Sequence, residues 1–244
     1  WCKSAAGQWG VCAPRGAGPA SGDASGVRLS EVSPQSGSGA DWVEIVNLGA
    51  EPAERKAQRR PDKPWILSGE QAFSYREVDN LSGRLAQGLS RVGVATGDTV
   101  LCMSQNRVEQ VFLWCALAKC GALLVPVNTH YRGNILSYLI NDSLAETIAI
   151  EAEFLQQLID VWDQLLHLKR VVLIAGKRES PGQVWEQIAS RYETHQYSDI
   201  LDDALFEGDT PGYRDFMGVF CTSGTTGRSK GVTMTPVSYT HLTL

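Results

Sequence analysis

The sequence predicts an α/β fold with a parallel sheet, preceded by a flexible segment and a possible β-hairpin. Short continuous apolar runs of strand length alternate with amphipathic helical stretches from about residue 61 to residue 221. Continuous apolar runs are typical of strands buried on both faces of a parallel sheet. The last run is followed by a glycine- and hydroxyl-rich segment, residues 222–231, and in such sheets ligands bind beyond the carboxyl ends of the strands.

The helices are indicated by their caps and by their apolar spacing. Ser74 and Glu77 have the spacing of a capping box, and apolar residues then recur at helical intervals up to Val92, before Gly93. Asn106 and Asn134 are expected to cap the next two helices. The expected strands are residues 64–67, 99–103, 123–125, 147–150, 171–174 and 217–221, and the expected helices are residues 75–92, 107–119, 135–140, 151–166 and 183–190.

Both ends of the chain differ from this pattern. Residues 1–26 are rich in glycine, serine and alanine, so we expect a flexible segment. Residues 27–32 and 41–47 alternate apolar and polar side chains, which indicates a hairpin, and residues 27–52 resemble the opening of a lamin-tail domain, an immunoglobulin-like β-sandwich. Residues 236–244 resemble a translated sequencing adapter, and we expect a non-native tail after a domain at 53–235. The chain does not begin with methionine, which suggests a fragment.

Composition and charge argue against several partners and sites. The net charge of −5 and the pI near 5.4 argue against nucleic acid. The most apolar window, residues 111–127, is interrupted by Lys119, Gly121 and Pro126, so no transmembrane segment is expected. Six cysteines without a C-x-x-C pair favour a reducing, cytoplasmic location. The acidic residues 196–210 are interpreted as a solvated loop or helix rather than a metal site. The oligomeric state stays open.

The motif segment reads Thr-Ser-Gly-Thr-Thr-Gly-Arg-Ser-Lys-Gly. Its glycines allow the backbone to approach an anion closely, its hydroxyls donate hydrogen bonds, and its lysine adds a mobile positive charge. The segment is not a Walker A loop, because Lys230 follows Ser229 and precedes Gly231. An ordinary polar surface loop is the alternative that composition leaves open.

This segment resembles the phosphate loop of the adenylate-forming (AMP-binding) superfamily, and residues 59–89 and 121–143 are similar to its acyl-CoA synthetase branch. The resemblance implies the incomplete parallel-sheet amino-terminal domain of such an enzyme. It implies that ATP, with Mg²⁺, and coenzyme A react with a fatty or carnitine-like carboxylic acid. It further implies that the chain lacks the carboxy-terminal catalytic half, so no catalytic residues and no metal ligands lie within it and the fragment is inactive. The residues implied to bind the ATP phosphates are Thr222, Ser223, Gly224, Thr225, Thr226, Gly227 and Lys230.

Two other interpretations are kept beside this one. The first is a lamin-tail-like interaction module that is followed by an enzyme relic. The second is an amino-acid adenylation domain, which would act with a carrier domain in place of coenzyme A.

Overall fold

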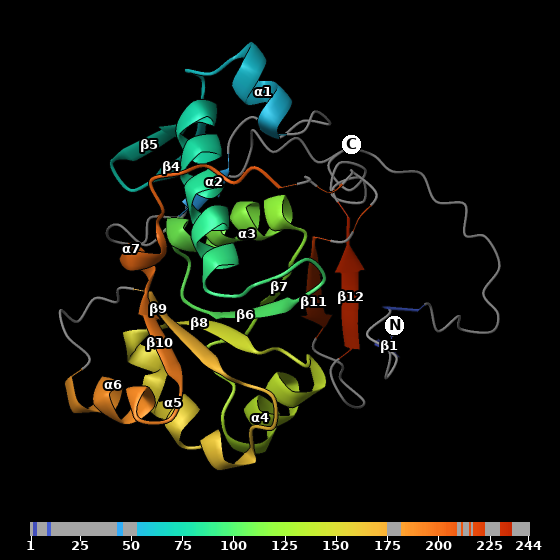
Figure 1. Cartoon of the computed structure of the whole chain (residues 1–244), viewed down its shortest axis with the longest axis vertical. Helices are drawn as coiled ribbons and strands as arrows, with labels where there is room; N and C mark the ends of the chain where they lie inside the picture. Colours follow the sequence, from blue (N-terminus) through green and yellow to red (C-terminus); the bar gives the residue numbers. More distant parts are fainter. Residues whose placement is uncertain are drawn as a thin grey trace, which may run out of the picture.

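A seven-stranded sheet forms the centre of the computed structural model, which describes residues 2–3, 9–10, 43–45, 53–174, 182–208, 211, 215, 217–222 and 230–235. Its strands are β6 (Thr99–Met103), β7 (Leu123–Pro126), β8 (Thr147–Glu151), β9 (Arg170–Ile174), β10 (Glu193–Gln196), β11 (Gly218–Thr222) and β12 (Lys230–Met234). They lie in the order β10-β9-β8-β6-β7-β11-β12 (Figure 1). All neighbours are parallel except β11 and β12, which are antiparallel. The predicted α/β class is confirmed, but β10 and β12 were not expected.

Helices cover both faces of this sheet, as the continuous apolar strands predict. The helices α2 (Tyr75–Arg91), α3 (Val108–Cys120) and α7 (Tyr197–Ile200) pack on one face, and α4 (Gly133–Asp142), α5 (Leu155–Ile159) and α6 (Gly182–Ala189) pack on the other (Figure 1). Successive residues of β6 point alternately to the two faces. Val100 and Cys102 therefore join the core beneath α2 and α3, whereas Leu101 and Met103 join the core on the side of α4 and α5.

The direction in which strands are added reverses twice, first after β7, which gives the switch between β6 and β8, and again after β10, when the chain returns to form β11 beside β7. The chain passes from β6 to its neighbour β7, and then returns to the opposite side of β6 to form β8, β9 and β10. Because parallel crossovers are right-handed, a reversal of direction transfers the connecting helix to the other face. This rule explains why α3 and α4, which follow each other along the chain, cover opposite faces.

Smaller sheets lie outside the central one. The strands β3 (Val43–Ile45), β4 (Pro64–Ser68) and β5 (Gln71–Ser74) form an antiparallel sheet, β1 (Cys2–Lys3) pairs with β2 (Trp9–Gly10), and α1 (Ala53–Arg59) precedes β4. The strand expected at residues 64–67 is confirmed. The proposed hairpin partner, residues 27–32, lies outside the described residues, and β3 pairs with β4. The domain boundaries at residues 26, 52 and 235 stay predictions.

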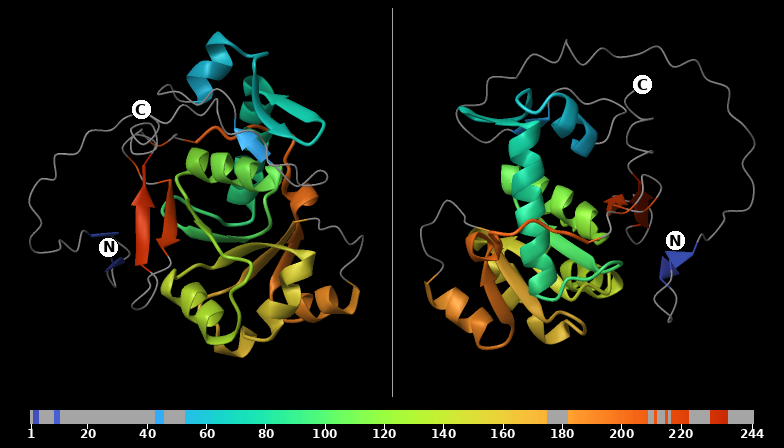
Figure 2. Two further views of the ribbon diagram at one scale, coloured as in Figure 1. Left: turned by 180° about the vertical axis from the view of Figure 1, so that it is seen from behind. Right: turned by 45° about the horizontal axis from the view of Figure 1, so that its top comes forward.

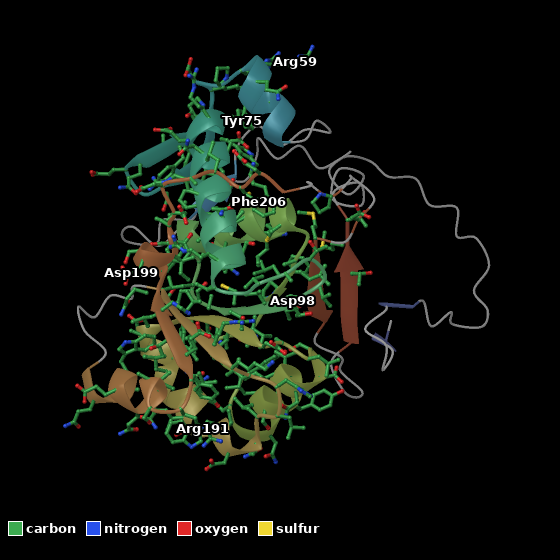
Figure 3. The ribbon with its side chains drawn as sticks, viewed as in Figure 1. Arg59, Tyr75, Asp98, Arg191, Asp199 and Phe206 are labelled. Atoms are coloured by element: carbon green, nitrogen blue, oxygen red, sulfur yellow. The ribbon has the colours of Figure 1, made fainter. Side chains whose placement is uncertain are left out.

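The return from α7 to β11 runs along α2. The backbone N–H of Phe206 donates to the carbonyl of Gly83 at 3.2 Å, and Arg84 Nε donates to the carbonyl of Asp202 at 2.6 Å. Arg91 Nη1 lies 2.6 Å from Asp202 Oδ2. Figure 3 shows Phe206 beside α2, which begins near the labelled Tyr75. The acidic segment expected to be solvated therefore has basic partners on α2.

Two expected helix caps are wrong. The Ser74–Glu77 capping box is present, but α3 begins after Arg107 and α4 after Arg132, without a side-chain cap in either case. Arg107 reaches Glu109 instead, with Nη2 at 2.8 Å from Oε1. At α4 the guanidinium of Arg132 donates to the carbonyls of Thr129 and Tyr131, which precede the helix.

The single helix expected at residues 151–166 is also wrong. Glu151 ends β8, and the chain then forms η2 (Ala152–Phe154), α5 and η3 (Trp162–Gln164). Asn141 on α4 donates from Nδ2 to the carbonyl of Gln164, and its Oδ1 accepts from the backbone N–H of Leu166. Leu165 between these two residues has an extended backbone, so the helical stretch ends at Gln164.

Within the described ranges, no helix combines the length and apolar character needed to cross a membrane.

Candidate functional site: the β11–β12 hairpin

The motif connects two antiparallel strands at the end of the sheet. The pairing of β11 with β12 runs from Gly218 opposite Met234 to Thr222 opposite Lys230. The connecting segment of the motif, residues 223–229, therefore starts directly after Thr222 and ends directly before Lys230, and these two residues are paired with each other. β12, drawn in red in Figure 2, is the end strand of the seven-stranded sheet.

The predicted phosphate-binding residues divide between described and undescribed parts of the chain. Thr222 and Lys230 are placed by the backbone of the two strands, which brings them together as a pair. The other five, Ser223, Gly224, Thr225, Thr226 and Gly227, lie outside the described residues. Their role as phosphate ligands stays a prediction.

The connecting segment leaves from the carboxyl edge of the sheet. Because β11 is parallel to β7, the end of β11 at Thr222 points the same way as the ends of β6, β7 and β8. In open α/β sheets this is the edge at which ligands bind. The position of the motif therefore agrees with the topological expectation.

Packing explains why the last residue of the motif, Gly231, is a glycine. A Cβ on Gly231 would lie 2.7 Å from Cγ1 of Val219, which is closer than real Cβ contacts. Val219 is 7% exposed and belongs to the core on the side of α4 and α5. Gly231 therefore lets β12 lie against a β11 side chain that is already fixed by the core.

A second group of polar side chains lies at the reversal between β6 and β8. The buried carboxylate of Glu151 accepts from the backbone N–H of Gln105 at 3.0 Å, and Arg107 Nε lies 3.7 Å from it. Burial raises the pKa of Glu151, with smaller opposing effects from Gln105 and Arg107, while Glu153 and Glu109 add to the rise. Arg107 also holds Glu109 through two hydrogen bonds.

Sequence reasoning missed this group because it placed Glu151 in a helix. The available signal was a carboxylate directly after four strand residues, 147–150, at the position where a parallel strand reaches the ligand-binding edge. Here the side chains bind one another across the reversal, so the group ties the end of β6 to the end of β8.

Metal-binding side chains do not cluster in the ranges that the structure describes, where no group of three or more is found. In proteins Mg²⁺ is commonly coordinated by substrate phosphates together with one or two carboxylates. The donor set of the motif, which offers backbone N–H groups, hydroxyls and a lysine, suits an anion rather than a cation.

This sheet and its hairpin belong to a known family. Residues 53–243 match the family model of the AMP-binding enzymes, so the chain is a member of that family. The lamin-tail resemblance receives no support, because the family match begins after it.

Two relatives and one solved structure illustrate the match. The chain is 26% identical over 188 residues to the medium/long-chain-fatty-acid–CoA/3-oxocholest-4-en-26-oate–CoA ligase of Mycobacterium marinum, covering 75% of this chain and 33% of that one. It is 29% identical over 166 residues to the crotonobetaine/carnitine–CoA ligase of Salmonella agona, covering 67% and 30%. The crystal structure of the anthranilate CoA ligase AuaEII with anthranoyl-AMP is similar in fold, with a TM-score of 0.64 at 23% identity over 77% of this chain and 34% of that one. The chain thus spans about a third of the length of the curated relatives it matches.

Proposed function

We propose that this chain is part of an ATP-dependent acid–thiol ligase that converts a fatty or carnitine-like carboxylic acid to an acyl-adenylate and then to an acyl-CoA. Membership in the AMP-binding family carries the proposal. The names of the two relatives, which are ligases of fatty acids and of crotonobetaine or carnitine, support the acid class. An amino-acid adenylation domain of the same family is the alternative, and acid-dependent formation of an acyl-CoA separates the two.

The proposed reaction has two steps. The carboxylate oxygen attacks the α-phosphorus of ATP, the bond to the β-phosphate oxygen breaks, and pyrophosphate leaves. The thiolate of coenzyme A then attacks the acyl carbonyl, and AMP leaves as the thioester forms. A carboxylate and a triphosphate repel each other, so positioning and charge neutralisation dominate the first step.

In this proposal the motif binds the β- and γ-phosphates. Backbone N–H groups of residues 223–227 and the side chains of Thr222, Thr225 and Thr226 would donate hydrogen bonds to the phosphates, and Lys230 would neutralise charge on the leaving pyrophosphate. Mg²⁺ bound to the phosphates would share that neutralisation. Thr222 and Lys230 are paired across the two strands, which supports the proposal that both ends of the motif bind the same phosphates.

Binding of nucleotides to the 244-residue chain tests the site. The variants Thr226→Ala and Lys230→Ala should weaken ATP binding by about tenfold, since a charge-assisted hydrogen bond contributes roughly 1.5–3 kcal/mol. AMP binding should not change, because AMP has no β- or γ-phosphate. Lys169→Ala removes the same charge from a surface pair with Glu146 and serves as the control. Equal losses for ATP and AMP in titration calorimetry would contradict the assignment.

We further propose that residues 1–244 alone do not catalyse the reaction, because they span about a third of the matched relatives. Acid-dependent release of pyrophosphate from ATP by the purified chain is the measurement. Robust turnover would overturn this part of the proposal and leave the assignment of the phosphate site intact.

The remaining assignments follow from the same chemistry. The partner is a small carboxylic acid, and the acidic pI argues against nucleic acid. We propose a cytoplasmic location, which the buried reduced thiols of Cys102 and Cys120 support.

A further inference from the structure

The hairpin that carries the motif is paired with its neighbour β7 only at its base, among the strands that the structure describes. β11 and β12 pair along their whole length, but the ladder between β11 and β7 contains the single pair Gly218 and Leu124. The backbone N–H of Leu124 donates to the carbonyl of Met217 at 3.4 Å, a long hydrogen bond. The ladder to β7 therefore does not fix the end of β11 that runs into the motif.

An aromatic contact connects this end of β11 to α3. The rings of Phe220 and Trp114 meet edge to face, with centroids 5.8 Å apart and an interplanar angle of 68°. Such a contact restricts orientation as well as distance, because the ring edge is attracted to the facing π-surface.

The base of the hairpin is shaped to admit this contact. A Cβ on Gly218 would lie 3.1 Å from the carbonyl oxygen of Leu124 and 3.8 Å from Nε1 of Trp114. The glycine thus lets β7 and the indole approach the same point of β11.

The helix that presents Trp114 is itself fixed. Leu113, which precedes Trp114 in the chain, is 1% exposed. The rings of Phe112 and Phe73 meet edge to face, with their centroids 5.2 Å apart. Lys119 at the other end of α3 is paired with Asp79 of α2 at 2.6 Å. The indole can therefore act as a rigid support for the strand.

A small tilt of the hairpin would displace the motif. Thr222 lies four residues beyond Gly218, or roughly 13 Å at about 3.3 Å per residue, so a tilt of about 5° moves it by about 1 Å. A displacement of that size can cost about a hundredfold in rate at a reacting centre.

We propose that Trp114 is a positioning residue for the phosphate site: its contact with Phe220 sets the angle of the hairpin and so aligns the motif with the β- and γ-phosphates of ATP. This inference rests on the proposed function. It assigns a role to a residue more than one hundred positions away in the chain, outside the motif. The contact acts on the phosphate tail alone, so it should matter for ATP and not for AMP.

The test compares ATP and AMP binding by titration calorimetry in the 244-residue chain. Trp114→Ala should weaken ATP binding by about tenfold and leave AMP binding unchanged, and Trp114→Phe, which keeps an aromatic edge, should restore most of the loss. Trp114→Leu keeps apolar bulk without a ring, so it gives the same readout if the alanine variant does not fold. Trp65→Ala is the control, because Trp65 packs against the same core cluster but contacts Tyr75.

The outcomes separate this inference from the function on which it rests. If the wild-type chain prefers ATP to AMP and the Trp114 variants keep that preference, the positioning role is wrong and the phosphate site stands. If Trp65→Ala reduces the preference as much as Trp114→Ala, general loss of packing explains the effect and the inference is also wrong. If the wild-type chain shows no preference for ATP, the proposed function and the inference fall together.

Discussion

Val219 and Gly231 face each other across the hairpin so closely that a Cβ on the glycine would lie 2.7 Å from Cγ1 of the valine. The valine is held by the core, and the glycine is the last residue of the motif. The structure leaves no space there for a side chain, so the geometry of the hairpin depends on one hydrogen atom in place of a methyl group.

Gly231→Ala should therefore destabilise the chain. Forcing an extra carbon into a packed position typically costs about 1–3 kcal/mol. Urea unfolding followed by circular dichroism measures the change. Val232→Ala on the same strand is the control, because Val232 is 48% exposed and should change stability little. A Gly231→Ala variant as stable as that control would contradict the packing argument.

The capping box of α2 gives a second prediction, with a control supplied by the sequence. Ser74→Ala should cost about 1 kcal/mol, because its Oγ accepts from the backbone N–H of Glu77. Asn106→Ala should cost little, since Asn106 is exposed and does not cap α3 in the structure. Equal losses in thermal or urea unfolding would contradict this difference between the two helix starts.

The same box predicts a dependence on pH. Hydrogen bonds from the backbone and side chain of Ser74 lower the pKa of Glu77. The carboxylate therefore contributes stability above its unfolded pKa, and that contribution is lost as pH falls through the folded pKa. The cost of Ser74→Ala should shrink in acid, which unfolding curves between about pH 3 and pH 7 can measure.

Glu151 should make stability depend on pH in the opposite direction. Burial raises its pKa, so the folded state holds the proton more tightly than the unfolded state does. The free energy of unfolding should fall as pH rises from the ordinary carboxyl range through the raised pKa. Glu151→Gln keeps an oxygen for the N–H of Gln105 and should flatten this fall. Glu186→Gln, at an exposed position of α6, is the control; a wild-type profile that neither variant changes would exclude the effect.

Cysteine reactivity is a fifth measurable consequence. Burial raises the pKa of Cys102 to about 12. Since the thiolate is the reactive form, Cys102 should resist iodoacetamide at pH 8 in the folded chain, while the half-buried Cys115 should react faster. Mass spectrometry of the peptides measures both rates, and denaturant should equalise them. Native Cys102 that reacts as fast as Cys115 would contradict its placement in the core.

Much of the fold could be predicted because its signals are local. The buried strands β6, β8 and β9 are continuous apolar runs, and α2 is marked by a cap and a regular apolar face. The missed strands β5, β10 and β12 carry exposed or half-buried residues. They are held by backbone pairing with a neighbour, which no periodicity of their own reveals.

The candidate site was only half accessible to sequence reasoning. The motif and its lysine were found from residue types, but Phe220 was noted only as part of an apolar run and Trp114 not at all. Their contact depends on the placement of α3 over β11, which is a relation between distant segments.

The sequence by itself determined the continuous apolar strands, the capped helix α2 and the place where the glycine-rich motif follows a strand. These properties follow from side-chain periodicity and backbone preferences within a few residues. Only the tertiary structure decided the order of the strands, the pairing of Thr222 with Lys230, and the partners of Asp202 and Glu151. Those depend on the packing of helices onto both faces of the sheet, and packing joins residues that the chain itself keeps far apart.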